Sequence, residues 1–230
     1  MSIGHGVGDV VVRVTDLART FGSGQSAVVA LHGVSCEIHA GDLIALTGPS
    51  GSGKTTLLHL LAGLDLPTKG TIEWPAIGGL DHLRPGPIAI VFQAPSLLPP
   101  LDVVENVALP LLLQGIDRHT ANQNAIAALR RLDLESIAAK LPEELSGGQA
   151  QRVAVARVLA GRPQMILADE PTGQLDHTSG AVVIEALIAA ATETGAALIV
   201  NTHDATVARQ LDHRWSMTNG RLITEASAAC

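Results

Sequence analysis

The sequence predicts an α/β fold: a mostly parallel sheet flanked by helices, with an N-terminal antiparallel β portion and an inserted helical subdomain. Strand-like apolar segments alternate with helical ones at both ends of the chain, whereas residues 93–161 are helical in character throughout. The chain has 230 residues and 47% of them are apolar, which is enough for one domain of this kind to bury a substantial core. We therefore expect a single domain over residues 1–230, with residues 1–92 and 162–230 forming its core.

Strands are expected in the first part of the chain at Val10–Val14, Val34–His39, Leu43–Thr47, Gly70–Trp74 and Ile88–Phe92. The third of these is a continuous apolar run, as in strands that are buried on both faces of a parallel sheet. A glycine-rich loop follows it, and then a helix from Lys54 to about Ala62, which Gly63 can terminate.

The helical stretch and the C-terminal part show their own boundary signals. Asp102 and Glu105 have the spacing of a capping box, and Thr120 is positioned to cap the next helix. One apolar helix face is formed by Ile126, Leu129, Leu132 and Ile137. The elements expected after them are a strand Met165–Ala168, a helix Thr178–Ala191, a strand Ala197–Thr202, a short helix from Ala205, and a hairpin with strands Trp215–Thr218 and Arg221–Thr224 around Asn219-Gly220.

Composition and charge argue against several classes of function. The net charge of −7 is unsuited to a protein whose affinity comes from neutralising nucleic-acid phosphates, so we expect no nucleic-acid partner. Cys36 and Cys230 have no metal or redox spacing and are expected to be reduced thiols of a cytoplasmic protein. No signal peptide is recognised, and no apolar run reaches the roughly 20 residues that span a bilayer. Any role at a membrane is therefore expected to come through a partner.

A phosphate-binding motif joins the strand Leu43–Thr47 to the helix that follows. Its sequence is Gly48-Pro49-Ser50-Gly51-Ser52-Gly53-Lys54-Thr55, which matches G-x-x-x-x-G-K-[ST] in the strand–loop–helix context of a P-loop NTPase core. Glycines allow the backbone to wrap closely around phosphate, so that N–H groups and the helix N-terminus can bind its oxygens. Lys54 is expected to neutralise the β- and γ-phosphates, and the Thr55 hydroxyl to ligate Mg²⁺. A glycine-rich structural turn is the alternative.

Two carboxylates end the apolar strand that begins at Met165. In an open α/β sheet, ligands bind outside the carboxyl ends of the strands, so Asp169 and Glu170 are expected beside the phosphate-binding loop. Asp169 is placed to hold the hydration shell of Mg²⁺, and Glu170 to orient the attacking water or accept its proton. A strand that runs into an acidic turn is the alternative interpretation.

A second helix start that can bind an anion is predicted at Leu145-Ser146-Gly147-Gly148-Gln149, ahead of a helix over Ala150–Ala160. Ser146 and Gln149 have capping-box spacing, so a well-capped helix is the simpler interpretation. Glycines in a first helical turn are nevertheless unfavourable unless something must approach the backbone closely. Their N–H groups make this segment a second candidate for phosphate binding.

Gly48–Thr56, Leu145–Gln149, Asp169-Glu170 and His203, in this order and spacing, resemble the ABC ATPases over nearly the whole chain. The resemblance implies an ATPase that uses Mg²⁺ with ATP as substrate. It also implies a head-to-tail homodimer, in which the P-loop of one copy, extended to Thr56, faces Ser146–Gln149 of the other copy across one ATP. A membrane permease is the further partner implied, which would hold the subunit on the inner face of the cell membrane.

Other residues receive their roles only through this resemblance. Gln93 corresponds to the Q-loop glutamine, Asp176 to the D-loop aspartate that acts in trans, and His203 to the switch histidine that contacts the γ-phosphate. Phe21 occupies the position where an aromatic ring stacks on adenine. Catalytic roles are thereby expected for Glu170, His203 and Gln93, and metal-binding roles for Thr55, Gln93 and Asp169. The alternatives are polar strand ends for Gln93 and His203, a helix N-cap for Asp176 and a core side chain for Phe21.

Within the family, the segments around Gln93 and Glu170 are similar to ATPases for lipoprotein release, macrolide export and cell division, which work with permeases that have large extracytoplasmic domains. The chain departs from the family between Thr71 and Ile88: it lacks the usual longer stretch with paired arginines and has Arg84 alone. A soluble ABC-type ATPase in a non-transport process is the alternative function. A GTPase is not favoured, because no Asn-Lys-x-Asp base-reading motif is found.

Overall fold

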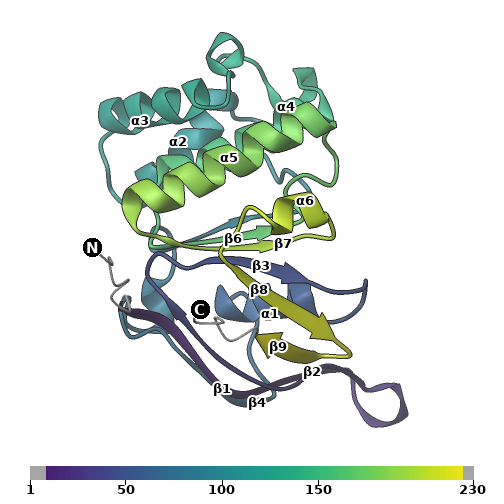
Figure 1. Cartoon of the computed structure of the whole chain (residues 1–230). Coiled ribbons are helices and arrows are strands. Elements are labelled where there is room, and N and C mark those ends of the chain that lie inside the picture. The colour runs from purple at the N-terminus through teal and green to yellow at the C-terminus, as the bar shows by residue number, and fades with distance from the viewer. Residues whose placement is uncertain (1–8, 225–230) are drawn as a thin grey trace, which may run out of the picture.

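Two β-sheets form the framework of residues 9–224, which are the residues that the computed structural model describes (Figure 1). The larger sheet consists, in spatial order, of β5 (Ile88–Val91), β6 (Met165–Asp169), β7 (Ala197–Asn201), β3 (Leu43–Thr47), β8 (His213–Thr218) and β9 (Arg221–Thr224). Its neighbouring strands are parallel except β8 and β9, which form the predicted hairpin. Asn219 and Gly220 have φ of +48° and +71°, as a tight turn between twisted strands requires. The predicted mostly parallel sheet is confirmed.

The smaller sheet is antiparallel, as predicted for the N-terminal portion. Its strands are β2 (Val28–His39), β1 (Val10–Phe21) and β4 (Lys69–Glu73), in this spatial order. The predictions for the first two were wrong in length, since β1 continues past Val14 and β2 begins before Val34. Register shifts on both sides of Leu17, with Asp16 at φ +47°, interrupt the alternation of apolar and polar residues although the strands remain paired.

Helix α1 (Lys54–Leu61) lies between the two sheets (Figure 1). Its leucines share one apolar core with side chains of both sheets; they are Leu57, Leu58, Leu60 and Leu61. Gly63, with φ +64°, follows the C-cap and ends the helix as predicted. Because β3 and α1 are both buried, the loop that joins them is held at each end by a rigid element.

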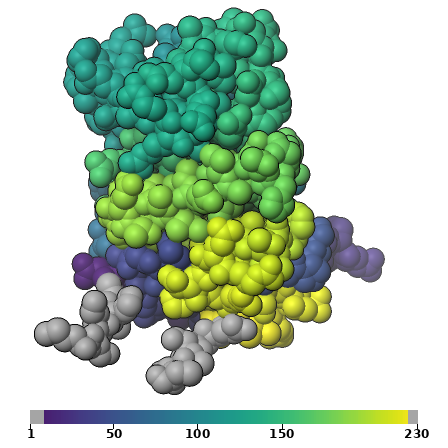
Figure 2. All heavy atoms as spheres, turned by 45° about the horizontal axis from the view of Figure 1, so that its top comes forward, coloured from purple at the N-terminus to yellow at the C-terminus, as the bar shows by residue number. Residues whose placement is uncertain are grey.

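The remaining α-helices lie on the opposite side of the larger sheet. They are α2 (Val103–Leu113), α3 (Arg118–Arg130), α4 (Gly147–Ala160), α5 (His177–Thr194) and α6 (Ala205–Ala208). Helix α5 lies over β6 and β7, and α2, α3 and α4 pack together beyond it (Figure 1). In the space-filling view these three helices form one end of the molecule and the C-terminal strands lie toward the other (Figure 2). A second apolar core joins them to the sheet.

Helix boundaries follow the capping rules, with one correction. The capping box of Asp102 and Glu105 at the start of α2 is confirmed. The prediction of Thr120 as a cap was wrong: α3 begins at Arg118, and the carboxylate of Asp117 accepts the Thr120 N–H at 3.0 Å, so Asp117 is the N-cap. Among the helices within residues 9–224, none has the length and apolarity needed to cross a membrane.

Candidate functional site

The loop between β3 and α1 requires glycine at two of its positions. Gly48 and Gly53 have φ of +140° and +101°. A Cβ atom at Gly48 would lie 2.1 Å from the carbonyl oxygen of Met217, and one at Gly53 would lie 2.4 Å from that of Ala30. The loop backbone therefore packs directly against neighbouring strands. No side chain of residues 9–224 caps the N-terminus of α1, which leaves its first N–H groups available to an anion.

Lys54 folds back onto the same loop. Its Nζ donates hydrogen bonds to the carbonyls of Gly48 and Pro49, both at 2.9 Å, and the residue is only 7% exposed. These acceptors are neutral, whereas an anionic oxygen forms a stronger hydrogen bond with an ammonium group. The Ser52 hydroxyl is buried and finds no hydrogen-bond partner within residues 9–224. The loop thus has donors that an anion would satisfy better than the protein does.

Asp169, the last residue of β6, is 6% exposed and pairs with a residue that sequence analysis missed. Its Oδ1 accepts a hydrogen bond from Nδ2 of Asn201, the last residue of β7. The parallel register of the two strands places Asp169 beside Asn201. Each is a polar residue that ends an otherwise apolar strand, and this was the signal available for Asn201. The strand order that brings the two side chains together cannot be predicted from a short stretch of residues.

Glu170 and His203 come from neighbouring strand ends and contact one another. Glu170 has φ +47°, a conformation that costs a non-glycine residue on the order of 1–3 kcal/mol and persists only where the surroundings impose it. Its Oε2 lies 2.8 Å from Nδ1 of His203. When the Glu170 carboxylate is ionised it can only accept, so Nδ1 is then the donor of this contact, and Nε2 has no hydrogen-bond partner within residues 9–224.

A cavity of 430 Å³ brings many of the predicted residues together. Its lining contains Gly48, residues 50–56, Gln93, Asp169, Glu170, Asn201 and His203, with residues 28–30 of β2. The loop contributes N–H groups and an ammonium group, whereas the strand ends contribute carboxylates. This distribution of charge suits a polyphosphate that is accompanied by a cation.

Ser146–Gln149 are not in the lining of this cavity. Ser146 is the N-cap of α4, and its Oγ accepts the N–H of Gln149 at 3.2 Å while its own N–H donates to Oε1 of Gln149 at 3.0 Å. The predicted capping box is therefore present. Ser146 and Gly147 are exposed and Gly148 and Gln149 are half-buried, so the segment lies at the surface, where the capping box satisfies the N–H groups of Ser146 and Gln149.

Asp176 is also outside the cavity and is the N-cap of α5. Its carboxylate accepts the N–H of Ser179 at 3.0 Å, and this hydrogen bond holds the pKa of the carboxyl below its usual value. The loop before α5 lies beside α4, since a Cβ atom at Gly148 would be 3.4 Å from Leu175. The structure thus places Ser146–Gln149 and the loop before α5 side by side, and both lie outside the 430 Å³ cavity.

Phe21, at the end of β1, is 43% exposed, which is not the environment of a core residue. The guanidinium carbon of Arg19 lies 4.5 Å from the centroid of its ring, in a cation–π contact. Phe21 does not line the 430 Å³ cavity, although its cross-strand partner Val28 does. The ring is therefore near the cavity without forming part of its wall.

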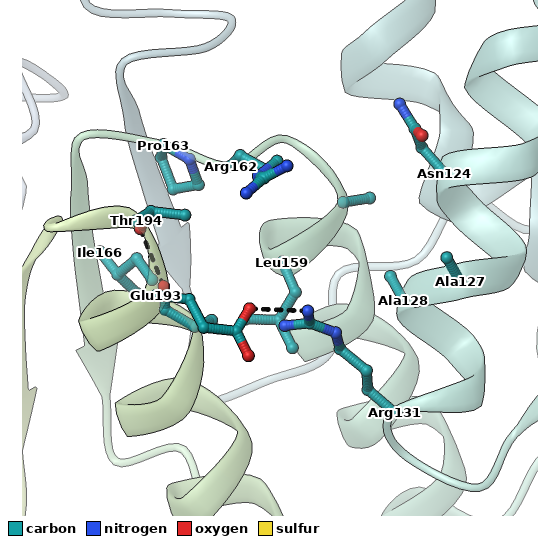
Figure 3. Close-up of a pocket in the computed structure, with 12 residues that line it drawn as sticks. Asn124, Ala127, Ala128, Arg131, Leu159, Arg162, Pro163, Ile166, Glu193 and Thr194 are labelled. Atoms are coloured by element: carbon teal, nitrogen blue, oxygen red, sulfur yellow. Dashed lines mark hydrogen bonds and ion pairs between the residues drawn. The ribbon is translucent and has the colours of Figure 1, made fainter.

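A second cavity, of 170 Å³, lies between α3, α4 and α5 (Figure 3). Arg131 and Glu193 form an ion pair across it, with 2.7 Å between Nη2 and Oε2. Thr194 uses its hydroxyl to donate to the carbonyl of Ala190 at 2.8 Å. None of the predicted site residues belongs to this lining. We assign no role in nucleotide binding to it.

Thr55, Gln93 and Asp169 offer a hydroxyl, an amide oxygen and a carboxylate to the 430 Å³ cavity. Mg²⁺ prefers oxygen ligands, and it usually retains waters and binds substrate phosphates in addition to one or two protein groups. This donor set fits Mg²⁺ when a nucleotide supplies further oxygens.

Comparisons with known proteins identify the family. The pattern of the family described as ABC transporter matches residues 31–173. The lipoprotein-releasing system ATP-binding protein LolD of Zymomonas mobilis is 40% identical over 222 residues, which cover 94% of this chain and 96% of that protein. LolD of Legionella pneumophila (strain Paris) is 40% identical over 221 residues, which cover 93% of this chain and 97% of that protein.

Solved structures agree with this assignment. The dimeric post-hydrolysis state of the ATP-binding cassette MJ0796, bound to ADP and Pi, has a TM-score of 0.86 at 35% identity and covers 94% of this chain and 97% of its own. The structure of cbiO1 from Clostridium perfringens, part of the ABC transporter complex cbiONQ, has a TM-score of 0.80 at 29% identity and covers 94% of this chain and 87% of its own.

The predicted resemblance is therefore confirmed, and these relatives favour a transporter subunit over the non-transport alternative. The chain belongs to the ABC transporter family, and it is an ATP-binding subunit that hydrolyses ATP for transport.

Proposed function

We propose that this subunit hydrolyses Mg-ATP between two copies arranged head to tail and thereby drives a permease of the lipoprotein-releasing type. The supporting observation is the division of the predicted site into two parts. The P-loop and the carboxylates share one cavity, whereas Ser146–Gln149 form a helix start outside it, where Ser146 and Gly147 are exposed. Within a single chain, a nucleotide in the cavity would meet only the first part. A second copy in the opposite orientation would supply the other.

In each half-site, the P-loop and the N-terminus of α1 bind the phosphates. Lys54 would exchange the carbonyls of Gly48 and Pro49 for β- and γ-phosphate oxygens, which are the better acceptors. The buried hydroxyl of Ser52 would gain a partner in the same step. Thr55, Gln93 and Asp169 would hold Mg²⁺, which neutralises phosphate charge when it is bound.

Glu170 is the proposed general base, with His203 and Gln93 as the other catalytic residues. The Glu170 carboxylate would orient the attacking water and accept its proton. The contact with Nδ1 of His203 restrains both side chains, and Nε2 stays available to contact the γ-phosphate. Most of the rate acceleration in such phosphoryl transfer comes from positioning and charge stabilisation.

The groups that act in trans are Ser146, Gly147, Gly148, Gln149 and Asp176. The N-terminus of α4 carries the positive end of the helix dipole, which favours the γ-phosphate of the ATP held by the second copy. Asp176 lies on the neighbouring helix start and would border the same interface. Phe21, exposed near the cavity, would stack on adenine through the face of its ring that Arg19 leaves free.

An apolar groove of 350 Å³ is the proposed docking place for the permease. Its lining includes Leu64, Phe92 and Leu113, and the last of these is 66% exposed. Burial of such side chains on a partner is favourable. Phe92 directly precedes Gln93, so a partner in the groove would contact the segment that enters the cavity. Residues 93–161 would form the helical subdomain that carries this movement.

The proposed cargo class rests on the relatives that are named for lipoprotein release. The subunit would be held on the inner face of the membrane by a permease with a large extracytoplasmic domain. Lipidated proteins would then be moved by mechanical work that begins with closure and reopening of the ATPase dimer.

The experiment is purification of the tagged full-length chain from detergent-solubilised native membranes, followed by reconstitution with whatever copurifies. We expect a permease with a large external domain in stoichiometric amount, and ATP-dependent release of a lipidated protein from the proteoliposomes. Recovery with a soluble assembly, or an active ATPase–permease complex that releases no lipoprotein, would contradict the proposal.

A further inference from the structure

The segment Phe92–Ser96, which contains Gln93, is held by two side chains of α4. Gln151 Nε2 donates to the carbonyl of Phe92 at 3.0 Å. Arg157 holds the other end: Nη1 donates to the carbonyl of Ser96 at 3.0 Å, and Nη2 donates to the Ser96 hydroxyl at 2.9 Å. Nη2 also reaches the carbonyl of Pro95 at 3.3 Å. The backbone on both sides of Gln93 is therefore anchored to one helix.

The environment of Gln151 makes a polar side chain unfavourable unless its hydrogen bond is needed. The residue is 1% exposed, and its Oε1 has no hydrogen-bond partner within residues 9–224. A buried polar atom without a hydrogen-bond partner is destabilising, and an apolar side chain of similar size would avoid this penalty. Arg157 is also partly buried, which lowers the pKa of its guanidinium, although arginine stays charged. At Gln151 a polar side chain therefore stands where packing alone would favour an apolar one, and the half-buried Arg157 gives up part of its hydration to reach the same segment.

Helix α4 connects these anchors to Ser146–Gln149. It is one continuous helix of 14 residues with Ser146 as its N-cap. At 1.5 Å of rise per residue, the distance along the axis from Gly147 to Arg157 is about 15 Å. Eight of its 14 residues are buried, and six of these belong to the apolar core. A displacement at the Ser146 end must therefore move Gln151 and Arg157 with it.

The segment Phe92–Ser96 also contacts α1, the helix that begins at the P-loop. The rings of Phe92 and His59 meet edge to face, with 6.2 Å between their centroids. The segment thus lies between the helix that starts at the P-loop and the helix that starts at Ser146–Gln149. Phe92 and Arg157 also line the 350 Å³ groove, so the same contacts border the proposed permease site.

We infer that Gln151 and Arg157 are positioning residues that make α4 and the segment Phe92–Ser96 move as one body. When Ser146–Gln149 engage the ATP held by a second copy, α4 carries Gln93 into place in the cavity of its own copy. Hydrolysis at one ATP site then depends on closure at the other. This inference rests on the proposed head-to-tail dimer and adds to it the contacts that link the two sites.

The test uses full-length variants that remove the link but leave the cavity lining unchanged. Gln151→Met preserves side-chain volume and removes the donor, and Arg157→Lys preserves the charge but loses the forked set of donors. Arg152→Lys is the matched control, because Arg152 also lies on α4 but donates to the carbonyl of Leu132. We expect kcat for ATP hydrolysis to fall on the order of tenfold in both test variants. KM, ATP-dependent dimerisation and the control variant should stay within about twofold of wild type.

A double-mutant cycle with Gln93 separates positioning from a merely structural role. If Gln151 acts through Gln93, Gln151→Met lowers kcat in the wild-type background and adds little once Gln93→Ala is present. Additive losses, or wild-type kcat in both test variants, would overturn the inference. If thermal unfolding shows that Gln151→Met does not fold, the same cycle with Arg157→Lys decides.

Failure of the proposed function would have a different signature. In that case Gln93→Ala and Glu170→Gln would keep wild-type turnover, and no variant would form an ATP-dependent dimer. Loss of turnover in these two variants, together with additive behaviour of Gln151→Met, would reject the positioning role alone.

Discussion

Helices α1 and α4 both begin at a predicted phosphate-binding motif, yet their N-termini are built differently. The start of α1 follows Gly53 in a left-handed conformation, and within residues 9–224 it receives no side-chain cap. Its lysine is folded onto loop carbonyls. The start of α4 has a reciprocal capping box in which Ser146 and Gln149 satisfy one another's N–H groups.

This difference indicates what each helix start lacks. Within residues 9–224, no side chain substitutes for a ligand at the first N–H groups of α1, so the P-loop is suited to bind phosphate within one chain. At the start of α4, the capping box satisfies the N–H groups of Ser146 and Gln149, which lowers the energetic cost of exposing this end. The N–H groups of Gly147 and Gly148 lie outside the box and are the ones left for a phosphate. Because this end has no ammonium group like that of Lys54, we expect it to bind ATP only after the P-loop of another copy has fixed the nucleotide.

The greatest loss of activity is expected from a change to Glu170, which directly follows β6 and lines the 430 Å³ cavity. Glu170→Gln removes a proton acceptor but keeps the shape, so turnover should fall at least about 100-fold while ATP-bound dimers accumulate. Phosphate release and light scattering measure the two effects. Glu185→Gln, at an exposed position of α5, is the matched control and should behave as wild type. Wild-type turnover in Glu170→Gln would remove this residue from the mechanism.

Gly48→Ala, in the loop between β3 and α1, should be the next most damaging change. The added Cβ would lie 2.1 Å from the carbonyl oxygen of Met217, at a φ of +140° that alanine rarely adopts. We expect a loss of unfolding free energy on the order of 3 kcal/mol and of ATP binding by the monomer. Urea unfolding and equilibrium nucleotide titration provide the measurements. An unchanged ATP affinity would mean that the loop tolerates another shape.

Gly147→Ala makes the same chemical change on the α4 side, with the opposite effect on stability. Within residues 9–224 nothing lies within 4 Å of the added Cβ, and Gly147 is the first residue of the helix, with a backbone conformation that alanine adopts readily. The unfolding free energy should therefore rise by about 0.4–1 kcal/mol, because alanine restricts the unfolded chain more than glycine does, and ATP binding by the monomer should be unaffected. Turnover should nevertheless fall, since the methyl group occupies the surface that a second copy's phosphate approaches. A Gly147→Ala variant that is less stable than wild type and keeps full turnover would contradict the proposed difference between the two helix starts.

The smallest effect is electrostatic and concerns Asp176. Its carboxyl pKa is lowered from 3.8, chiefly by the backbone hydrogen bond from Ser179. A lowered folded-state pKa means that the stabilisation is fully present above pH 3.8 and is lost as pH falls through the folded value. Asp176→Asn keeps a neutral cap, so the stability advantage of wild type should shrink between pH 6 and pH 3. Thermal unfolding at both pH values measures it, and a pH-independent difference would argue against the cap.

Patterns formed by a few adjacent residues were sufficient to predict much of the fold. The capping box at Asp102, the glycine stop at Gly63 and the Asn219-Gly220 hairpin were predictable because each depends on a few adjacent residues. The lengths of β1 and β2 were not, since bulges near Leu17 break the alternation while long-range pairing maintains the strands. The prediction of Thr120 as the cap of α3 was wrong because the sequence does not fix the position of the first helical turn, which makes Asp117 the N-cap.

The chemistry of each loop and strand end follows from its local residues: glycines that let backbone approach phosphate, a lysine at a helix start and carboxylates after a buried strand. Which of these ends meet depends on the three-dimensional fold. The register of parallel strands places Asn201 beside Asp169, and Glu170 contacts His203. Side chains of α4 donate hydrogen bonds to the backbone on both sides of Gln93. These contacts depend on strand order and helix packing between segments far apart in the chain, and no local pattern of residues encodes that order.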